Sequence, residues 1–173
     1  RALPDRRVLA DVAAAVEFLA GRPGVGAVGI TGFCLGGQYA LMAACTVPRL
    51  AACVSWYGML RYARTDDVKP ASPLDLAPRL GCPYLGLFGA EDALIPETDV
   101  EVLRGILTRE RTTFDIEVYQ GAGHAFFNDA RPAGYRPEVA RRAWPRAVEF
   151  LRRHLDPLRV FVQKGPGRDE REG

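Results

Sequence analysis

The chain has 173 residues, 48% of them hydrophobic, and its 23 Lys and Arg nearly balance its 21 Asp and Glu. This length and composition fit one soluble globular domain and argue against a polyanion-binding surface, so no nucleic-acid partner is expected. No apolar run approaches the roughly 18–20 residues of a membrane span, and the first residues lack a signal-peptide pattern. We therefore expect no membrane association and a cytoplasmic location.

A first amphipathic helix, with an apolar face of Val8, Val12, Val16 and Leu19, is predicted from their helical spacing, and it stops at the Gly/Pro segment 21–24. The following segment, 24–29, fits the G-x-G-x-x-G pattern of a dinucleotide site. That chemistry needs a strand before the glycines and a helix after them, whereas here the order is reversed. No dinucleotide is therefore expected to bind here.

Four short apolar runs, bounded by Gly, Pro or polar residues, are predicted to be buried strands, and they cover 27–31, 51–56, 84–88 and 114–119. Between and after them lie stretches with helical character, at 36–46, 97–107 and 137–155. This alternation predicts an α/β fold, a mainly parallel sheet with helices on both faces. The charged, Pro-rich segment 61–80 is expected to pass over the top of the sheet. We predict one domain over 1–162 and a disordered tail over 163–173.

A strand, a tight turn and a helix meet at Gly32-Phe33-Cys34-Leu35-Gly36, the context of a G-x-S-x-G nucleophile elbow with Cys in place of Ser. Glycines at 32 and 36 are expected because side chains there would clash with the neighbouring chain. The dipole of the following helix favours a thiolate at Cys34, and the backbone N–H of Leu35 is a candidate oxyanion-hole donor. Alternatively, the glycines only permit tight packing around a buried cysteine.

Acidic and basic partners for this nucleophile follow in the order that α/β-hydrolases use. Glu91 and Asp92 leave the end of the strand at 84–88, and both are candidates for the acid, with Asp92 preferred. His124 follows the strand at 114–119 and is the predicted base. A turn or capping role for Asp92 and a structural role for His124 remain as alternatives.

The other cysteines, Cys45, Cys53 and Cys82, form no CxxC pair, and with two histidines in the chain there is no zinc spacing. We expect these three thiols to be buried in a reducing compartment and no metal to be bound. Cys34 is accordingly predicted to be the only fast-reacting thiol.

With these residues in place, the chain resembles the dienelactone hydrolase (carboxymethylenebutenolidase) family of the α/β-hydrolase superfamily. The resemblance runs from the first helix to Leu155 and rests on several motifs in the same order, namely Gly32-Phe33-Cys34-Leu35-Gly36-Gly37, Ser55-Trp56-Tyr57-Gly58, Leu85–Asp92 with Ile95-Pro96, and Gly123–Asp129. It implies a hydrolase without metal or cofactor in which Cys34 attacks a small ester or lactone and forms an acyl-thioester. His124 then moves the proton, and Asp92 orients His124. Candidates for the substrate pocket within these motifs are Phe33, Tyr57, Phe126 and Asn128.

Two departures from the family pattern affect these expectations. Dienelactone-cleaving members are expected to hold the substrate carboxylate with arginines, one of them four residues beyond the histidine, where this chain has Asn128. A broader carboxylesterase or lactonase is therefore at least as well supported. The chain also resembles only the C-terminal two-thirds to three-quarters of a member, so the N-terminal strands and one oxyanion-hole donor are expected to be missing.

These missing strands suggest three further expectations. The strand at 27–31 would form an unpaired sheet edge, through which the chain could self-associate. Hydrolysis by this chain alone would be weak or absent. The alternative functions are a thioesterase or acyltransferase that uses the same three residues, or a catalytically dead scaffold.

Overall fold

The structure of the chain is a computed structural model that describes residues 3–156, so the predicted tail at 163–173 and the end of the predicted domain lie outside the described residues. The helices and strands alternate along the chain, as the apolar runs predicted. They are α1 (Asp5–Ala20), β1 (Val28–Phe33), α2 (Leu35–Ala44), β2 (Leu50–Trp56), α3 (Pro73–Leu76), a 3-10 turn η1 (Ala77–Arg79), β3 (Tyr84–Gly89), α4 (Glu97–Arg109), β4 (Phe114–Tyr119) and α5 (Pro137–Leu155).

The four strands form one parallel sheet in the order β1-β2-β3-β4. β2 and β3 are buried along nearly their whole length, which explains why both read as continuous apolar runs. The register pairs Phe33 with Trp56, Trp56 with Leu87, and Gly89 with Tyr119. All four strands therefore end along one border of the sheet, which we call the carboxyl edge.

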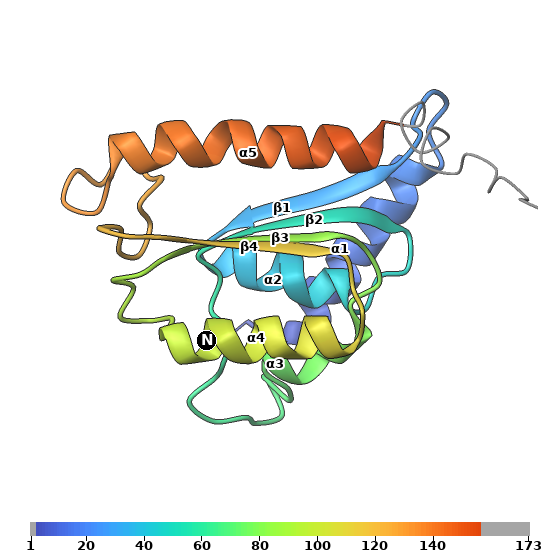
Figure 1. The fold of residues 1–173 in the computed structure, drawn as a ribbon. Coiled ribbons are helices and arrows are strands. Elements are labelled where there is room, and N and C mark those ends of the chain that lie inside the picture. The colour runs from blue at the N-terminus through green and yellow to red at the C-terminus, as the bar shows by residue number, and fades with distance from the viewer. Residues whose placement is uncertain (1–2, 157–173) are drawn as a thin grey trace, which may run out of the picture.

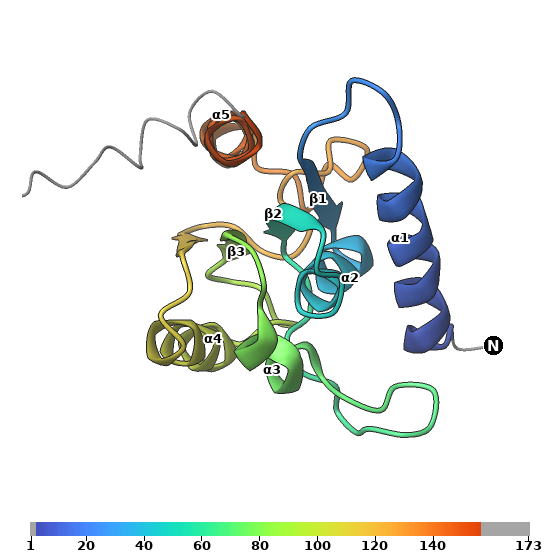
Figure 2. The ribbon, with the colours of Figure 1, turned by 90° about the vertical axis from the view of Figure 1, so that its right-hand side faces the viewer.

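Helices cover both faces of the sheet, as predicted (Figure 1). α5 lies on one face and contacts β1, β2 and β3, whereas α2 lies on the other face against β1 and β2. α4 lies beside α2 on that second face, and α1 flanks α2 near β1 (Figure 2). Within the described residues β1 pairs only with β2, so it is a border strand of the sheet, as expected.

Two details of the predicted packing are wrong. Leu19 is 44% exposed, and the inner face of α1 is instead formed by Leu9, Val12, Ala13 and Val16. The segment 61–80 does not pass over the top of the sheet. It packs beside the start of α1, where the N–H of Asp5 donates to the carbonyl of Val68, and it contains α3 and the 3-10 turn. Its charged residues are used there in side-chain contacts that apolar periodicity cannot indicate.

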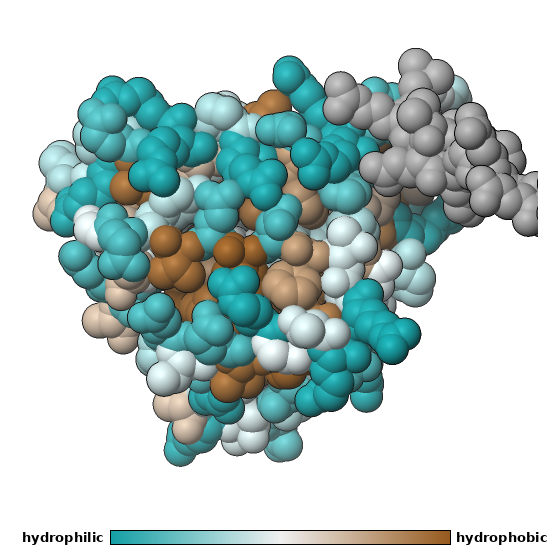
Figure 3. Space-filling model, in the orientation of Figure 1, coloured by the Kyte–Doolittle hydropathy of each residue, from teal (hydrophilic) through white to brown (hydrophobic). Residues whose placement is uncertain are grey.

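The surface over β4 is largely hydrophilic, with an apolar patch in its middle between α5 and α4 (Figure 3). This agrees with β4, where Phe114 and Val118 are only partly buried. Among residues 3–156, no helix is both long enough and apolar enough to cross a bilayer.

Candidate active site

Cys34 stands at the sharp turn between β1 and α2, with φ 53° and ψ −118°. A non-glycine residue with positive φ is strained and persists only where its surroundings hold it. Here the N–H of Cys34 donates to the carbonyl of Trp56 over 2.9 Å, and its carbonyl accepts from the N–H of Gln38 over 3.0 Å. The thiol is exposed at the carboxyl edge, so the alternative of a buried structural cysteine is wrong.

The glycines around this turn do not all have the predicted steric role. A Cβ at Gly32 would lie 2.1 Å from the carbonyl oxygen of Gly36, which no side chain allows. At Gly36 itself, however, a Cβ would meet nothing within 4 Å, so the expected clash there is wrong. The second crowded position is Gly37, where a Cβ would lie 2.6 Å from the carbonyl oxygen of Trp56. The close approaches are thus between the start of α2 and the ends of both β1 and β2.

The structure brings Cys34, His124 and Asp92 together across the ends of three strands. His124 Nε2 lies 3.0 Å from Cys34 Sγ, and His124 Nδ1 lies 2.8 Å from Asp92 Oδ2. The side chain of Asp92 is fully buried, whereas that of His124 is 24% exposed. Asp92 also accepts a hydrogen bond from the N–H of Leu94 over 2.9 Å. Of the two candidate carboxylates, Asp92 rather than Glu91 is therefore the partner of the imidazole.

The loops that carry Asp92 and His124 are joined to each other. The N–H of Glu91 donates to the carbonyl of Ala122 over 2.9 Å, and a Cβ at Gly89 would lie 2.3 Å from the same oxygen. Arg136, at the start of α5, closes the histidine loop, since its Nε donates to the carbonyl of Gly121 over 3.0 Å. These contacts fix the distance between the carboxylate and the imidazole.

A cavity of about 530 Å³ opens beside the sulfur. Its lining includes three of the predicted pocket residues, Phe33, Tyr57 and Asn128, but not Phe126, which is fully buried beneath Tyr57. The sequence reading missed four residues of the histidine loop that also line it: Ala125, Phe127, Asp129 and Arg131. The loop has no periodicity, so the sequence carries no signal of which side chains face inward.

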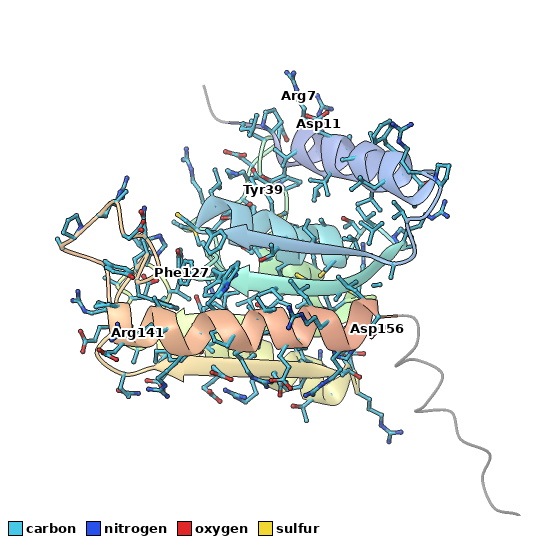
Figure 4. All side chains as sticks on the ribbon, turned by 90° about the horizontal axis from the view of Figure 1, so that it is seen from above. Arg7, Asp11, Tyr39, Phe127, Arg141 and Asp156 are labelled. Atoms are coloured by element: carbon cyan, nitrogen blue, oxygen red, sulfur yellow. The ribbon has the colours of Figure 1, made fainter. Side chains whose placement is uncertain are left out.

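Stacked aromatic rings extend from the cavity toward α5. Phe127 stacks on Phe33 at 5.6 Å between ring centroids and on Trp144 at 5.6 Å, with Trp56 packed behind them. Figure 4 shows Phe127 at the carboxyl edge, next to the first half of α5. One wall of the cavity is therefore apolar and flat.

Backbone strain gathers around the same cavity. Four non-glycine residues in the described part of the chain have positive φ, and three of them, Cys34, Tyr57 and Ala125, line the cavity. Leu35, the first residue of α2, has one of the N–H groups that a helix start leaves without an intrahelical partner. Such a donor beside the sulfur can hold a negatively charged oxygen.

Comparison with known proteins gives one consistent result. The family model "Dienelactone hydrolase family" matches residues 2–155. A Bradyrhizobium protein named as a probable 2-oxo-3-(5-oxofuran-2-ylidene)propanoate lactonase is 41% identical over 155 residues, which are 88% of this chain and 62% of that protein. A crystal structure from Klebsiella pneumoniae, described as a "Putative Dienelactone Hydrolase", is 40% identical with a TM-score of 0.79, over 85% of this chain and 61% of that one. The chain belongs to the dienelactone hydrolase family.

Proposed function

We propose that this chain carries the catalytic centre of a hydrolase of small esters or lactones, with Cys34 as the nucleophile. The observation that carries the proposal is the exposed sulfur of Cys34, 3.0 Å from an imidazole whose other nitrogen is 2.8 Å from the buried Asp92. A carboxylate in that position holds the ring orientation and stabilises the imidazolium that forms. Because the imidazole faces the cavity, it can both take and return a proton there.

The proposed reaction has two halves. His124 takes the thiol proton, the sulfur attacks the carbonyl carbon, and the carbonyl electron pair moves to oxygen, where the N–H of Leu35 is the proposed donor. The C–O bond to the leaving oxygen then breaks, and that oxygen receives the proton from His124. Water attacks the resulting acyl-thioester with His124 as base, and the carboxylic acid and the free thiol are released. In a lactone the leaving oxygen remains attached to the acyl chain.

The cavity further suggests which substrates fit. Its volume of about 530 Å³ suits a small molecule, and the rings of Phe33 and Phe127 offer a flat apolar wall. Arg131 lines the cavity and has no ion-pair partner among the described residues. The Bradyrhizobium relative is named for a lactone that bears a propanoate group. We propose that the substrate is a planar, anionic lactone whose carboxylate pairs with Arg131. Arg131 would then take the role of the arginine expected in dienelactone-cleaving members at the position where this chain has Asn128.

The chain spans 62% and 52% of the lengths of two curated relatives, the Bradyrhizobium protein and a Methylorubrum extorquens protein. Ester or lactone hydrolysis by a protein as long as these relatives is therefore also a proposal. Cytoplasmic location and self-association through β1 remain predictions.

Hydrolysis of p-nitrophenyl acetate and of an unsaturated lactone carboxylate by this chain tests the proposal, with Cys34→Ala as the control. We expect the substitution to lower the rate by about 1,000-fold or more, while circular dichroism stays unchanged. Equal rates for the two chains would contradict a role for the sulfur.

Arg131→Gln tests the choice of substrate. We expect KM for the lactone carboxylate to rise about 10-fold, because a charge-assisted hydrogen bond is lost, and KM for the neutral ester to stay the same. An equal change for both substrates would contradict pairing between Arg131 and a carboxylate.

A further inference from the structure

Tyr57, at the end of β2, is held tightly in an unusual backbone conformation. Its φ is 40°, its N–H donates to the carbonyl of Leu87 over 2.8 Å, and only 2% of the residue is exposed. The next residue, Gly58, is so close to α2 that a Cβ would lie 2.4 Å from the nitrogen of Gln38. Strained non-glycine residues of this kind persist where the surrounding structure over-determines them, and they gather at functional sites.

The hydroxyl of Tyr57 has no hydrogen-bond partner among the described residues. Burial of a hydroxyl without a partner costs on the order of 1–3 kcal/mol, and proteins ordinarily avoid it. The buried Tyr39 and Tyr119 show the usual solution, since each donates to a carboxylate, over 2.8 Å and 2.6 Å. Tyr57 has no such acceptor and lines the cavity instead.

A comparison with Tyr84, a second buried tyrosine, shows how the hydroxyl of Tyr57 differs. The hydroxyl of Tyr84 also makes no hydrogen bond of good geometry, although Ser55 lies close enough to affect its pKa, but Tyr84 is 0% exposed and does not line the cavity. Unlike the hydroxyl of Tyr84, the hydroxyl of Tyr57 is not completely shielded from solvent in the described part of the chain. What little surface Tyr57 exposes therefore includes its hydroxyl, which can receive a partner only from the cavity.

The surroundings of the ring keep this hydroxyl protonated and next to the reacting groups. The ring of Tyr57 meets that of His124 edge-on at 5.4 Å between centroids and that of Phe126 at 5.1 Å. Burial, and then the negative charge that Cys34 can carry, raise the pKa of the Tyr57 phenol well above its usual range. Tyr57 is thus a neutral donor in neutral and mildly alkaline solution.

We propose that the Tyr57 hydroxyl donates a hydrogen bond to an oxygen of the bound ester or lactone at the reacting centre. This inference rests on the proposed hydrolase function and makes Tyr57 a catalytic residue in addition to Cys34, His124 and Asp92. The acceptor is either the carbonyl oxygen or the leaving oxygen, since both gain negative charge during the reaction and both lie beside the sulfur.

Tyr57→Phe removes only the hydroxyl, and Tyr84→Phe is the matched control because it also removes an unpartnered hydroxyl from a buried ring. We expect Tyr57→Phe to lower kcat/KM by about 10- to 100-fold, mainly through kcat, and Tyr84→Phe to leave it unchanged. Neither variant should melt at a lower temperature, because each loses an unsatisfied polar group.

Two esters with the same acyl group identify the acceptor oxygen. A loss with both p-nitrophenyl acetate and phenyl acetate assigns the hydrogen bond to the carbonyl oxygen. A loss that is larger for phenyl acetate assigns it to the leaving oxygen, because p-nitrophenolate needs less help to leave.

Reversible addition of the Cys34 thiol to a trifluoromethyl ketone gives a readout that needs no turnover. The S–C bond forms, the carbonyl electrons move to oxygen, and the thiol proton goes to His124 or to that oxygen. We expect Tyr57→Phe to weaken this adduct by about 10-fold when the carbonyl oxygen is the acceptor. The inference is overturned if Tyr57→Phe hydrolyses both esters with the same kcat/KM as the unaltered chain. If the unaltered chain hydrolyses neither ester, the inference is overturned when both chains bind the ketone with equal affinity. Absence of both hydrolysis and ketone addition in the unaltered chain would contradict the proposed function separately.

Discussion

Two aspartates, Asp5 and Asp92, are buried to a similar extent but have different surroundings. Asp5, at the start of α1, is 2% exposed and accepts from Tyr39, Tyr62 and Lys69 over 2.8, 2.9 and 2.8 Å. These donors come from α2 and from the segment before α3, and Figure 4 shows Tyr39 on the side of α2 that faces α1. Every oxygen of Asp5 is used within the protein, so this cluster joins three parts of the fold.

Asp92 is 4% exposed, and its hydrogen bond to His124 leads outward to the exposed sulfur of Cys34. The two sites show that burial and hydrogen bonding alone do not mark a candidate catalytic carboxylate. The useful difference is where the hydrogen bonds lead: at Asp5 they continue through Tyr62 to the buried Gln38, whereas at Asp92 they end at the exposed sulfur of Cys34 beside a cavity.

Replacing each of these two aspartates by asparagine is expected to give the largest difference in kcat between variants. Asp92→Asn should lower kcat for ester hydrolysis by about 100- to 10,000-fold, because an amide can hold the imidazole in the wrong tautomer and cannot stabilise the imidazolium. Asp5→Asn should change kcat by less than about 3-fold where the variant is folded. Steady-state assays of both variants check this, and similar losses would contradict the distinction between the two aspartates.

Backbone crowding makes the next largest contrast, within the active site itself. Gly32→Ala should destabilise the fold by about 3 kcal/mol or more, because its Cβ would overlap the carbonyl of Gly36. Gly36→Ala is the control and should be stable, with a gain of up to about 1 kcal/mol from helix propensity. Urea unfolding of both variants measures the difference, and equal stabilities would show that the turn relaxes.

Loss of the Asp5 carboxylate should weaken the fold rather than the chemistry. Asp5→Asn should lower the free energy of unfolding by about 2–3 kcal/mol, because Lys69 loses its counterion and two phenols lose a charged acceptor. The effect stays below that of a fully buried pair because the side chain of Lys69 is 27% exposed. Denaturant unfolding measures it, with Tyr62→Phe as a smaller change at the same site.

Thiol labelling is expected to show the smallest effect of these experiments, but it tests the exposure of each cysteine directly. Cys34 should be the one thiol that iodoacetamide modifies in the folded chain at pH 8, since the other three are buried. Burial raises the pKa of Cys45 to about 12 and that of Cys82 to about 11, so both stay protonated. All four should react in urea. Peptide mapping checks the sites, and early labelling of Cys53 would contradict the packing of β2.

The sequence indicated which residues meet at the proposed active site better than it indicated the cluster around Asp5, for a physical reason. Asp92 and His124 each follow a strand directly, and parallel strands end at one edge, so element order alone brings them near Cys34. The partners of Asp5 lie 34 to 64 residues away, two of them in a segment without periodicity. No local pattern encodes how that segment packs.

The same limit explains the errors inside the site. Phe126 and Phe127 are adjacent aromatic residues, and which one faces the cavity depends on the turn at Ala125, where φ is 60°. Likewise, the crowding at Gly37 rather than Gly36 depends on how closely α2 lies against the end of β2. Both outcomes follow from backbone path, which residue types alone do not specify.

The aromatic wall of the cavity also makes the chain convenient to observe. Its two tryptophans, Trp56 and Trp144, both pack against Phe127 of this wall, with centroids 6.3 Å apart, and Trp56 is fully buried whereas Trp144 is 50% exposed. Intrinsic fluorescence excited at the indole band therefore reports on the carboxyl edge and hardly at all on the region of Asp5. A molecule that stacks on Phe33 changes the surroundings of a neighbouring indole 5.1 Å away, so binding can be followed without any label.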